Sequence, residues 1–216
     1  MSETPSHPKI YHITHVDNLK PIVQAGRLFS DARMAANDSG CRIVGMSDIK
    51  RRRLEEIEVS CHPGTFVGEY VPFCFCPRSI MLYILHRGNH PNLTYRGGQE
   101  PIVHLQADFH TAVRWAESKS RRWAISDRNA GTYLAEFYNR PGDLDKFNWD
   151  AIASNDFREM KTKEGKQAEF LMHNSFPWEL VESIGAIDSR WAKRVDDVLH
   201  SVSHRPAVRV ERAWYF

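Results

Sequence analysis

Short apolar runs separated by polar turns make up most of the chain, and long amphipathic helices are absent from the pattern. Runs of four to eight β-branched and aromatic residues are typical of buried strands. Such runs predict strands at residues 10–14, 71–76, 102–105 and 123–126, with shorter ones at 170–172, 186–187 and 208–210.

Helices are predicted between these strands from their capping residues. Side-chain oxygens of Asp and Ser satisfy free N–H groups at a helix start, and glycine is common where a helix ends. These signals predict helices after Asp17 (ending at Gly26), after Ser47 through the run Lys50–Leu54, after Ser79, after Asp108 (109–116), at 149–157, from Ser175 to Ile184, and at 190–199. The irregular alternation of short strands and helices favours an α+β fold over a doubly wound sheet.

A long segment without a clear strand lies between residues 129 and 168. Five aromatic residues alternate with charges in it: Tyr133, Phe137, Tyr138, Phe147 and Trp149. Loops of this length in a compact domain usually serve a function when they are ordered. We therefore expect a single domain over residues 9–216 with a substrate loop at about 129–168, preceded by a polar, disordered stretch at residues 1–8.

Composition sets broad limits on function. The chain has 216 residues, 42% of them hydrophobic and 26% charged, as in an ordinary globular domain. The net charge of +2 is too small for a general polyanion binder, although basic residues cluster at 50–53, at 121–122 and within 158–166. With no basic leader and no apolar run of about 18 residues, we expect a cytoplasmic protein without a membrane span.

The four cysteines do not indicate a metal site. Cys74 and Cys76 stand two apart in a strand, and no second pair of Cys or His lies at zinc-binding spacing. We expect reduced, buried thiols and no metal.

Three pieces of the sequence could supply chemistry together. His12 and Thr14 stand two apart on a strand, so their side chains face the same way and could bind a polar ligand such as a ribose. In the helix after Ser47, Ile49 and Arg53 lie four apart on one side, which turns Arg53 inward. Glu169 is a single carboxylate at the entrance of the strand that follows a basic loop.

These pieces fit NAD⁺ used as a substrate. An arginine fork suits a diphosphate. A carboxylate near the ribose stabilises the oxocarbenium-like centre that forms when the glycosidic bond breaks. Neither a glycine-rich phosphate loop nor a G-x-S-x-G elbow occurs, so the sequence does not indicate a P-loop enzyme, a dinucleotide fold of the Rossmann type or an α/β-hydrolase.

The sequence resembles the DarT family of bacterial DNA ADP-ribosyltransferase toxins along nearly its whole length. The resemblance rests on the stretches 11–19 (YHITHVDNL), 71–79 (VPFCFCPRS) with 81–83, 97–101 (GGQEP), 126–128 (SDR), 166–169 (KQAE) and the terminal WYF. It implies an ADP-ribosyltransferase-like split β-sheet around an NAD-binding cleft. It also implies transfer of ADP-ribose from NAD⁺ onto a thymidine base in single-stranded DNA, with a macrodomain ADP-ribosylglycohydrolase as antitoxin. We expect a monomer.

The resemblance also implies roles for individual residues. Glu169 and Arg53 are the implied catalytic residues, with Arg52 as the alternative to Arg53. The implied NAD⁺ contacts are His12, Ile13, Thr14, Pro21, Phe29 and Arg53. On the basic loop, Arg158, Lys163 and Lys166 are expected to meet DNA phosphates, and the loop aromatics to stack bases.

One position departs from the family pattern. Relatives often have Pro-Phe-Tyr-Phe where this chain has Pro72-Phe-Cys-Phe75, so Cys74 replaces an aromatic that could stack on nicotinamide. Three alternatives remain open at this point: a transferase acting on RNA or protein, an NAD⁺ hydrolase, and a non-catalytic nucleic-acid-binding module.

Overall fold

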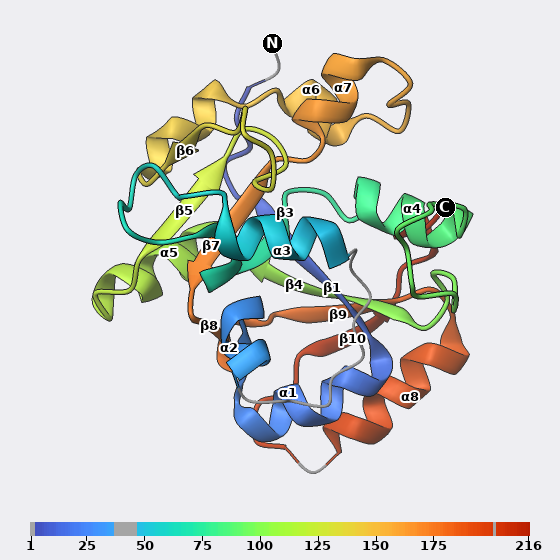
Figure 1. Cartoon of the computed structure of the whole chain (residues 1–216). Coiled ribbons are helices and arrows are strands. Elements are labelled where there is room, and N and C mark those ends of the chain that lie inside the picture. Colours follow the sequence, from blue (N-terminus) through green and yellow to red (C-terminus); the bar gives the residue numbers. More distant parts are fainter. Residues whose placement is uncertain (1–2, 37–46, 201) are drawn as a thin grey trace.

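The computed structural model of the protein describes residues 3–36, 47–200 and 202–216, with side chains from Ile49 onward in the second range. Its centre is an eight-stranded sheet in the order β10-β9-β4-β1-β3-β7-β5-β6, beside a two-stranded sheet β2-β8 (Figure 1). The strands are β1 (Lys9–His15), β2 (Arg27–Phe29), β3 (Tyr70–Cys74), β4 (Ile102–Asp108), β5 (Trp123–Ser126), β6 (Phe137–Tyr138), β7 (Glu169–His173), β8 (Ser175–Pro177), β9 (Ser183–Ala186) and β10 (Ala207–Val210).

The large sheet is split between its two middle strands. β1 pairs with β4 over seven residues, and β3 pairs with β7 over five. Between β1 and β3, however, the only paired residues are Tyr11 and Cys74. The two halves of the sheet therefore meet at one point and diverge from it, which opens space between them. The predicted α+β fold with a split sheet is confirmed.

Helices cover the sheet on both sides. They are α1 (Leu19–Ala25), α2 (Asp31–Ala36), α3 (Ser47–Glu55), α4 (Ile80–Arg87), α5 (Phe109–Ser118), α6 (Trp149–Ala153), α7 (Met160–Gly165) and α8 (Ser189–Leu199). In Figure 1, α3 crosses in front of the middle strands, and α4 lies close to the C-terminus. Among the described residues, no helix has the length and apolar character needed to cross a bilayer.

Several helix ends follow the signals in the sequence. The Asp108 carboxylate accepts a hydrogen bond from the Thr111 N–H at the start of α5, and the Ser79 hydroxyl accepts one from the Leu82 N–H at the start of α4. Gly26 ends α1 in the left-handed conformation, with φ of 65°. Glycine adopts this conformation at little cost, so it stops the helix and lets β2 begin.

Other predicted elements are wrong, and the reason is tertiary pairing. The helix predicted from Ser175 to Ile184 is instead β8, a 3-10 turn (Trp178–Leu180) and β9. β8 pairs with β2, where Pro177 is tolerated because the strand lies at a sheet edge. Asp17 lies within a 3-10 turn (Val16–Asn18) rather than capping α1.

The segment 129–168 is more ordered than its sequence indicated. It contains the short strand β6, a 3-10 helix (Pro141–Lys146), α6 and α7. Likewise α2 occupies the start of the polar stretch that follows Phe29, and residues 37–46 lie outside the described residues. At the other end of the chain, Pro8 is buried and its carbonyl accepts a hydrogen bond from the Phe109 N–H, a contact that the prediction of a disordered stretch at 1–8 did not include.

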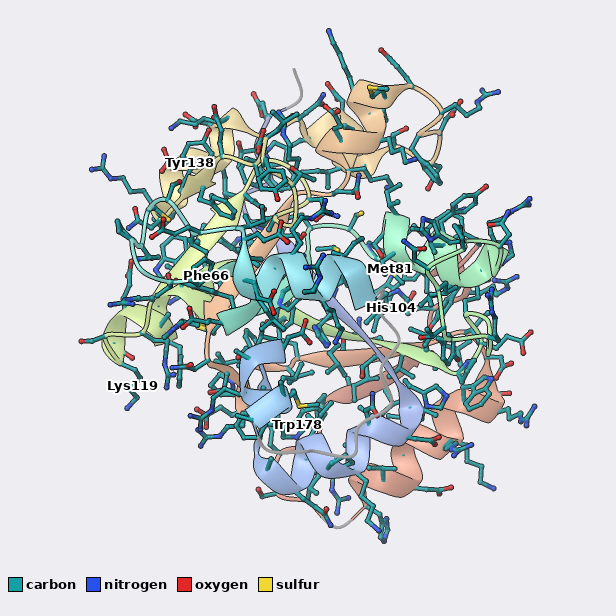
Figure 2. All side chains as sticks on the ribbon, viewed as in Figure 1. Phe66, Met81, His104, Lys119, Tyr138 and Trp178 are labelled. Carbon is teal, nitrogen blue, oxygen red and sulfur yellow. The ribbon has the colours of Figure 1, made fainter. Side chains whose placement is uncertain are left out.

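Figure 2 shows the side chains on the ribbon, with the exposed Lys119 extending from the periphery of the molecule. One core residue is an unexpected cation. Lys166 is only 2% exposed, and its Nζ donates a hydrogen bond to the Ile152 carbonyl at 3.0 Å. Lys166 therefore fixes α6 against the strand entrance, and the structure does not place it where a DNA phosphate could reach it.

Candidate active site

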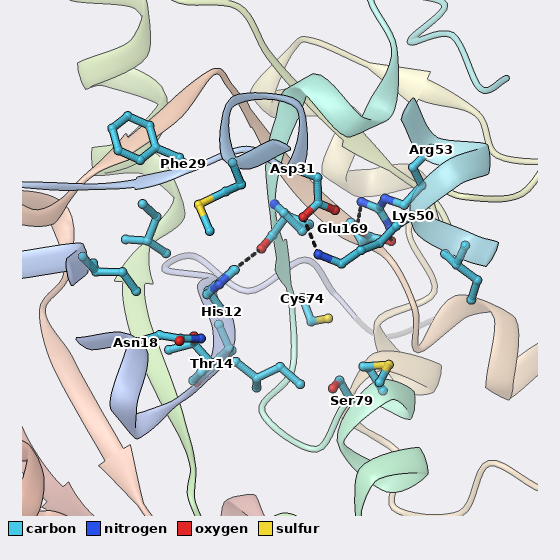
Figure 3. A pocket seen from close by; sticks show the side chains of 18 of the residues that line it. His12, Thr14, Asn18, Phe29, Asp31, Lys50, Arg53, Cys74, Ser79 and Glu169 are labelled. Carbon is cyan, nitrogen blue, oxygen red and sulfur yellow. Dashed lines mark hydrogen bonds and ion pairs between the residues drawn. The ribbon is translucent and has the colours of Figure 1, made fainter. Parts of the chain in front are cut away.

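A cavity of about 510 Å³ opens where the two halves of the sheet diverge. All of the predicted catalytic and NAD⁺-contacting residues line it: His12, Ile13 and Thr14 from β1, Pro21 from α1, Phe29 from β2, Arg53 from α3 and Glu169 from β7 (Figure 3). Residues that lie up to 157 positions apart are thus brought to one site by the split between β1 and β3.

The most strongly held pair in the cavity is Arg53 with Glu169. The Nη1 and Nη2 atoms of Arg53 donate to Oε1 and Oε2 of Glu169 at 3.1 and 2.9 Å, and both side chains are buried. A third donor, the Ala130 N–H, reaches Oε1 at 2.9 Å. Such a two-pronged pair fixes the direction of the carboxylate as well as its charge.

Burial alone would lower the pKa of Arg53, but the charge of Glu169 and its hydrogen bonds outweigh this effect, so the pKa lies above the usual arginine value. Arg53 therefore remains a cation in this site. A group in this state can stabilise a negative charge, but it is a poor proton acceptor.

Secondary structure explains why Arg53, rather than Arg52, holds this place. Ile49 and Arg53 lie one turn apart on the face of α3 that lines the cavity. Arg52 is not among the lining residues; it is half-buried, and its buried Nε atom has no hydrogen-bond partner among the residues that the structure describes. Arg51 points to solvent, with 66% of its side chain exposed.

His12 and Thr14 lie side by side on β1, as their spacing predicted. The Nδ1 atom of His12 lies 2.8 Å from the Pro72 carbonyl oxygen. Burial lowers the pKa of His12, outweighing the effect of that hydrogen bond, so the ring is neutral. Because a carbonyl only accepts, Nδ1 carries the proton, and Nε2 is left as an acceptor. The Thr14 hydroxyl accepts a hydrogen bond from Asn18 Nδ2 at 3.1 Å.

Several lining residues were not predicted from the sequence. Lys50 and Asp31 form an ion pair at 2.6 Å that joins α3 to α2 at the cavity (Figure 3). Asn129 and Gln167 line the cavity beside Glu169, and Asn18 and Ser79 also line it. Gln167 stands two residues before Glu169, which is a usable signal. The other contacts join residues far apart in sequence, and no local pattern marks them.

Cys74 also lines the cavity, directly opposite Glu169 in the register of β3 and β7. Burial, with a further contribution from the Glu169 carboxylate, raises the pKa of its thiol well above the usual value. The thiol is therefore neutral, and Cys74 presents a small, weakly polar surface to the cavity. Among the described cysteines, Cys61, Cys74 and Cys76 are all free.

The residues predicted to meet DNA divide into two groups. Arg158 and Lys163 are exposed, Arg158 in an ion pair with Asp156, whereas Lys166 is buried as described above. The predicted base-stacking aromatics divide in the same way. Phe137, Phe147 and Trp149 are core residues, and Tyr138 has Lys146 over its ring at 4.2 Å. Tyr133 is 70% exposed.

Metal ligation has no arrangement to support it in the part of the chain that the structure describes. Three or more His, Cys, Asp or Glu side chains do not come together there in a group that could hold an ion. The Glu169 carboxylate is held by an arginine and a backbone N–H.

A family model described as "ssDNA thymidine ADP-ribosyltransferase, DarT" matches residues 11–216. The chain belongs to the DarT family. It is 34% identical over 215 residues to the DNA ADP-ribosyl transferase of Thermus sp. (strain 2.9), covering 98% of each chain. It is 36% identical over 209 residues to the Thermus aquaticus enzyme of the same description, covering 96% of this chain and 88% of that one.

Solved structures of the family match the fold of this chain. Thermus sp. 2.9 DarT in complex with ADP-ribosylated ssDNA matches over the whole of both chains with a TM-score of 0.89 at 33% identity. The same protein in complex with NAD⁺ matches with a TM-score of 0.82 at 32% identity, covering 99% of this chain and 100% of that one. As a DarT member, this chain is an NAD⁺-dependent DNA ADP-ribosyltransferase, and the resemblance seen in the sequence is confirmed.

The pairing of Arg53 predicts a large loss of stability when its partner is left alone. In Arg53→Ala the Glu169 carboxylate stays buried without a cation, and we expect the free energy of unfolding to fall by about 3–5 kcal/mol. Glu169→Ala in the same background restores part of the loss, because the buried charge is gone. Urea denaturation measures both. Arg52→Ala is the control, with a loss under about 1 kcal/mol; an equal loss there would contradict the assignment of Arg53.

The lowered pKa of His12 predicts how NAD⁺ binding depends on pH. The ring stays neutral as the pH falls through about 6.5, the ordinary histidine value, and gains a proton only below it. Nε2 then becomes a donor, so we expect the Kd for NAD⁺ to be constant from pH 8 to 6.5 and to rise at lower pH. Titration calorimetry measures it. His12→Gln should remove the rise of Kd at low pH, whereas His86→Ala, at an exposed position, should keep it. The same rise of Kd in His12→Gln would contradict the assignment of His12 as an acceptor for NAD⁺.

Proposed function

We propose that Glu169 and Arg53 carry the transfer of ADP-ribose from NAD⁺ to a thymine base of single-stranded DNA. The observation that supports this assignment is their two-pronged pair within the cavity, where a carboxylate and a permanent cation face the same enclosed space. His12, Ile13, Thr14, Pro21 and Phe29 line the same cavity and are the proposed NAD⁺ contacts.

Bond cleavage comes first in the proposed reaction. The bond between the ribose C1 and the nicotinamide nitrogen breaks, and neutral nicotinamide leaves with the electron pair. The ribose is left with oxocarbenium character, which the Glu169 carboxylate stabilises through the adjacent 2-hydroxyl. Glu169 already accepts three hydrogen bonds, and a carboxylate has about four acceptor positions, so one remains for the ribose.

The thymine imide nitrogen then bonds to the ribose C1 and loses its proton to solvent. Arg53 is proposed to stabilise the negative charge that develops on the imide. Its raised pKa supports this electrostatic role over proton acceptance, since the guanidinium does not release its own proton to become a base. The sequence also suggests that Arg53 binds the diphosphate. Glu169 takes two of the five guanidinium N–H donors, so Arg53 keeps donors for a phosphate oxygen, and the neighbouring Lys50, which is paired with Asp31, is a second candidate for that contact.

Single-stranded DNA is the acceptor that this chemistry favours, because a duplex pairs the imide edge of thymine. Exposed Arg158 and Lys163 are the proposed phosphate contacts. Tyr133 is the proposed stacking residue. Its hydroxyl donates a hydrogen bond to Glu56, the residue after α3, and Glu56 also lies 3.8 Å from Arg51 in the last turns of that helix. An exposed ring and an exposed cation therefore lie on either side of Glu56.

A thymine modified on its imide edge can no longer pair with adenine, so template reading stops there. This consequence supports the proposal that the enzyme acts as a toxin whose partner is a macrodomain that removes ADP-ribose. Thermosipho africanus DarTG in complex with ADP-ribose shares the fold, with a TM-score of 0.75 at 20% identity; the match covers 97% of this chain and 51% of that one. That the protein is a monomer remains a prediction.

The function is tested by intact mass spectrometry of oligonucleotides incubated with the protein and NAD⁺. We expect wild type to add one ADP-ribose to a single-stranded oligonucleotide with one thymidine, and to leave a thymidine-free oligonucleotide unchanged. Glu169→Ala should abolish the gain, because the ribose cation loses its carboxylate.

Each other outcome has a definite meaning. Free ADP-ribose without modified DNA indicates an NAD⁺ hydrolase. Modification of RNA or of the protein in place of DNA indicates a transferase with a different acceptor. If wild type consumes no NAD⁺, the proposed reaction is wrong. If Glu169→Ala is as active as wild type, the assignment of Glu169 as a catalytic residue is wrong.

Tyr133 provides a test of the DNA surface. Stacking of a base on an aromatic ring contributes about 1–3 kcal/mol, so Tyr133→Ala should weaken oligonucleotide binding about 5- to 150-fold. Fluorescence anisotropy measures the affinity. Tyr133→Phe keeps the ring and should bind as wild type does, and Tyr138→Ala is the matched control. If Tyr133→Phe binds as weakly as Tyr133→Ala, the hydroxyl rather than the ring is responsible.

A further inference from the structure

The turn formed by residues 129–132 touches both proposed catalytic side chains. The Thr132 N–H donates to the Asn129 carbonyl at 3.2 Å, and the Asn129 Oδ1 atom accepts from the Gly131 N–H at 2.8 Å. Asparagine is favoured at this position of a turn because its side chain can hydrogen-bond the backbone two residues on. The side chain of Asn129 therefore sets the shape of the turn.

This shape decides where the backbone meets Glu169 and Arg53. The Ala130 N–H donates to Glu169 Oε1, a bond that is fully buried. At Gly131, a Cβ atom would lie 3.2 Å from Cγ of Arg53 and 3.3 Å from Cγ2 of Ile49, so the turn packs directly on α3. A small shift of the turn would therefore displace both the hydrogen bond to the Glu169 carboxylate and the packing contact with Arg53.

The turn is itself held from the other end of the substrate loop. Asn129 Nδ2 donates to Gln167 Oε1 at 3.2 Å, and Gln167 Nε2 donates to the Lys163 carbonyl at 2.9 Å. The Asn129 amide accepts from Gly131 and donates to Gln167, and the Gln167 amide accepts from Asn129 and donates to Lys163. An amide that flips by 180° would lose both of its bonds. The result is a chain of hydrogen bonds that are all donated in one direction, from the turn that holds Glu169 through two amides to the Lys163 carbonyl of α7.

We propose that Asn129 and Gln167 are positioning residues that fix Glu169 and Arg53 for catalysis through this chain of hydrogen bonds, which we call the amide relay. The inference rests on the proposed function, since it assigns these residues to the same reaction. Both side chains also line the cavity. Their amide groups are engaged with each other and with backbone, however, so the relay assigns them an indirect role rather than contact with substrate.

The relay predicts a separation of kcat from KM. A displacement of about 1 Å in a catalytic group can cost up to about 100-fold in rate. We expect Asn129→Ala and Gln167→Ala each to lower kcat for transfer about 10- to 100-fold, with the KM for NAD⁺ and for the oligonucleotide within about twofold of wild type. Asn139→Ala, at an exposed position in the same loop, is the matched control and should leave both parameters unchanged.

The double variant gives the sharper result. Because the relay is broken once by either change, Asn129→Ala/Gln167→Ala should lose no more than about twofold in kcat beyond the worse single variant. Gln167→Glu provides a second probe if Asn129→Ala does not fold. It keeps the acceptor for Asn129 but removes the donor to the Lys163 carbonyl, and we expect it to lower kcat as Gln167→Ala does. Melting temperatures establish that each variant is folded.

Three results would overturn the relay. They are additive losses in the double variant, a raised KM for either substrate at unchanged kcat, and wild-type kinetics in both single variants. The first makes the residues independent, and the second makes them substrate contacts. All three require that wild type modifies the oligonucleotide; if it does not, the proposed function fails rather than the relay.

Discussion

The structure depends on the burial of one opposite charge pair, Arg53 with Glu169. A carboxylate placed alone in such a cavity would be costly, and so would an arginine. Their two parallel hydrogen bonds offset the cost of burying each charge, and the Ala130 N–H donates to a further acceptor position of the carboxylate. The pair therefore requires that α3, the entrance of β7 and the turn at 129–132 come together, and these three segments surround the reacting groups.

The split sheet supplies the space in which this pair can act. Pairing of β1 with β3 at only Tyr11 and Cys74 lets β1 diverge from β3, and His12 and Thr14 of β1 line the cavity that opens there. The donor nucleotide is thus expected to lie along β1, with the bond to be broken near β7.

Much of the site could be predicted from the sequence because the decisive signals are local. His12 and Thr14 share a face by strand alternation, and Asp108 and Ser79 cap helices as their positions indicated. Arg52 and Arg53 could not be separated with certainty, since they differ by only about 100° around a helix whose start was uncertain.

The parts that were missed depend on distant contacts. The helix predicted at 175–184 gave way to pairing of β8 with β2, and the basic residue Lys166 proved to be a buried hydrogen-bond donor. The ion pair of Asp31 with Lys50 and the bond from Asn129 to Gln167 join residues 19 and 38 positions apart. Composition and periodicity carry no information about such pairs.

Both ends of the substrate loop are anchored close to Glu169, the first by the turn at 129–132 and the second by α7 and Gln167. The exposed residues of the loop, such as Tyr133 and Arg158, lie between these anchors. Under the function proposed above, substitutions and insertions there would alter the contacts to DNA without disturbing the carboxylate. Acceptor choice and bond breaking would then depend on separate parts of the same segment.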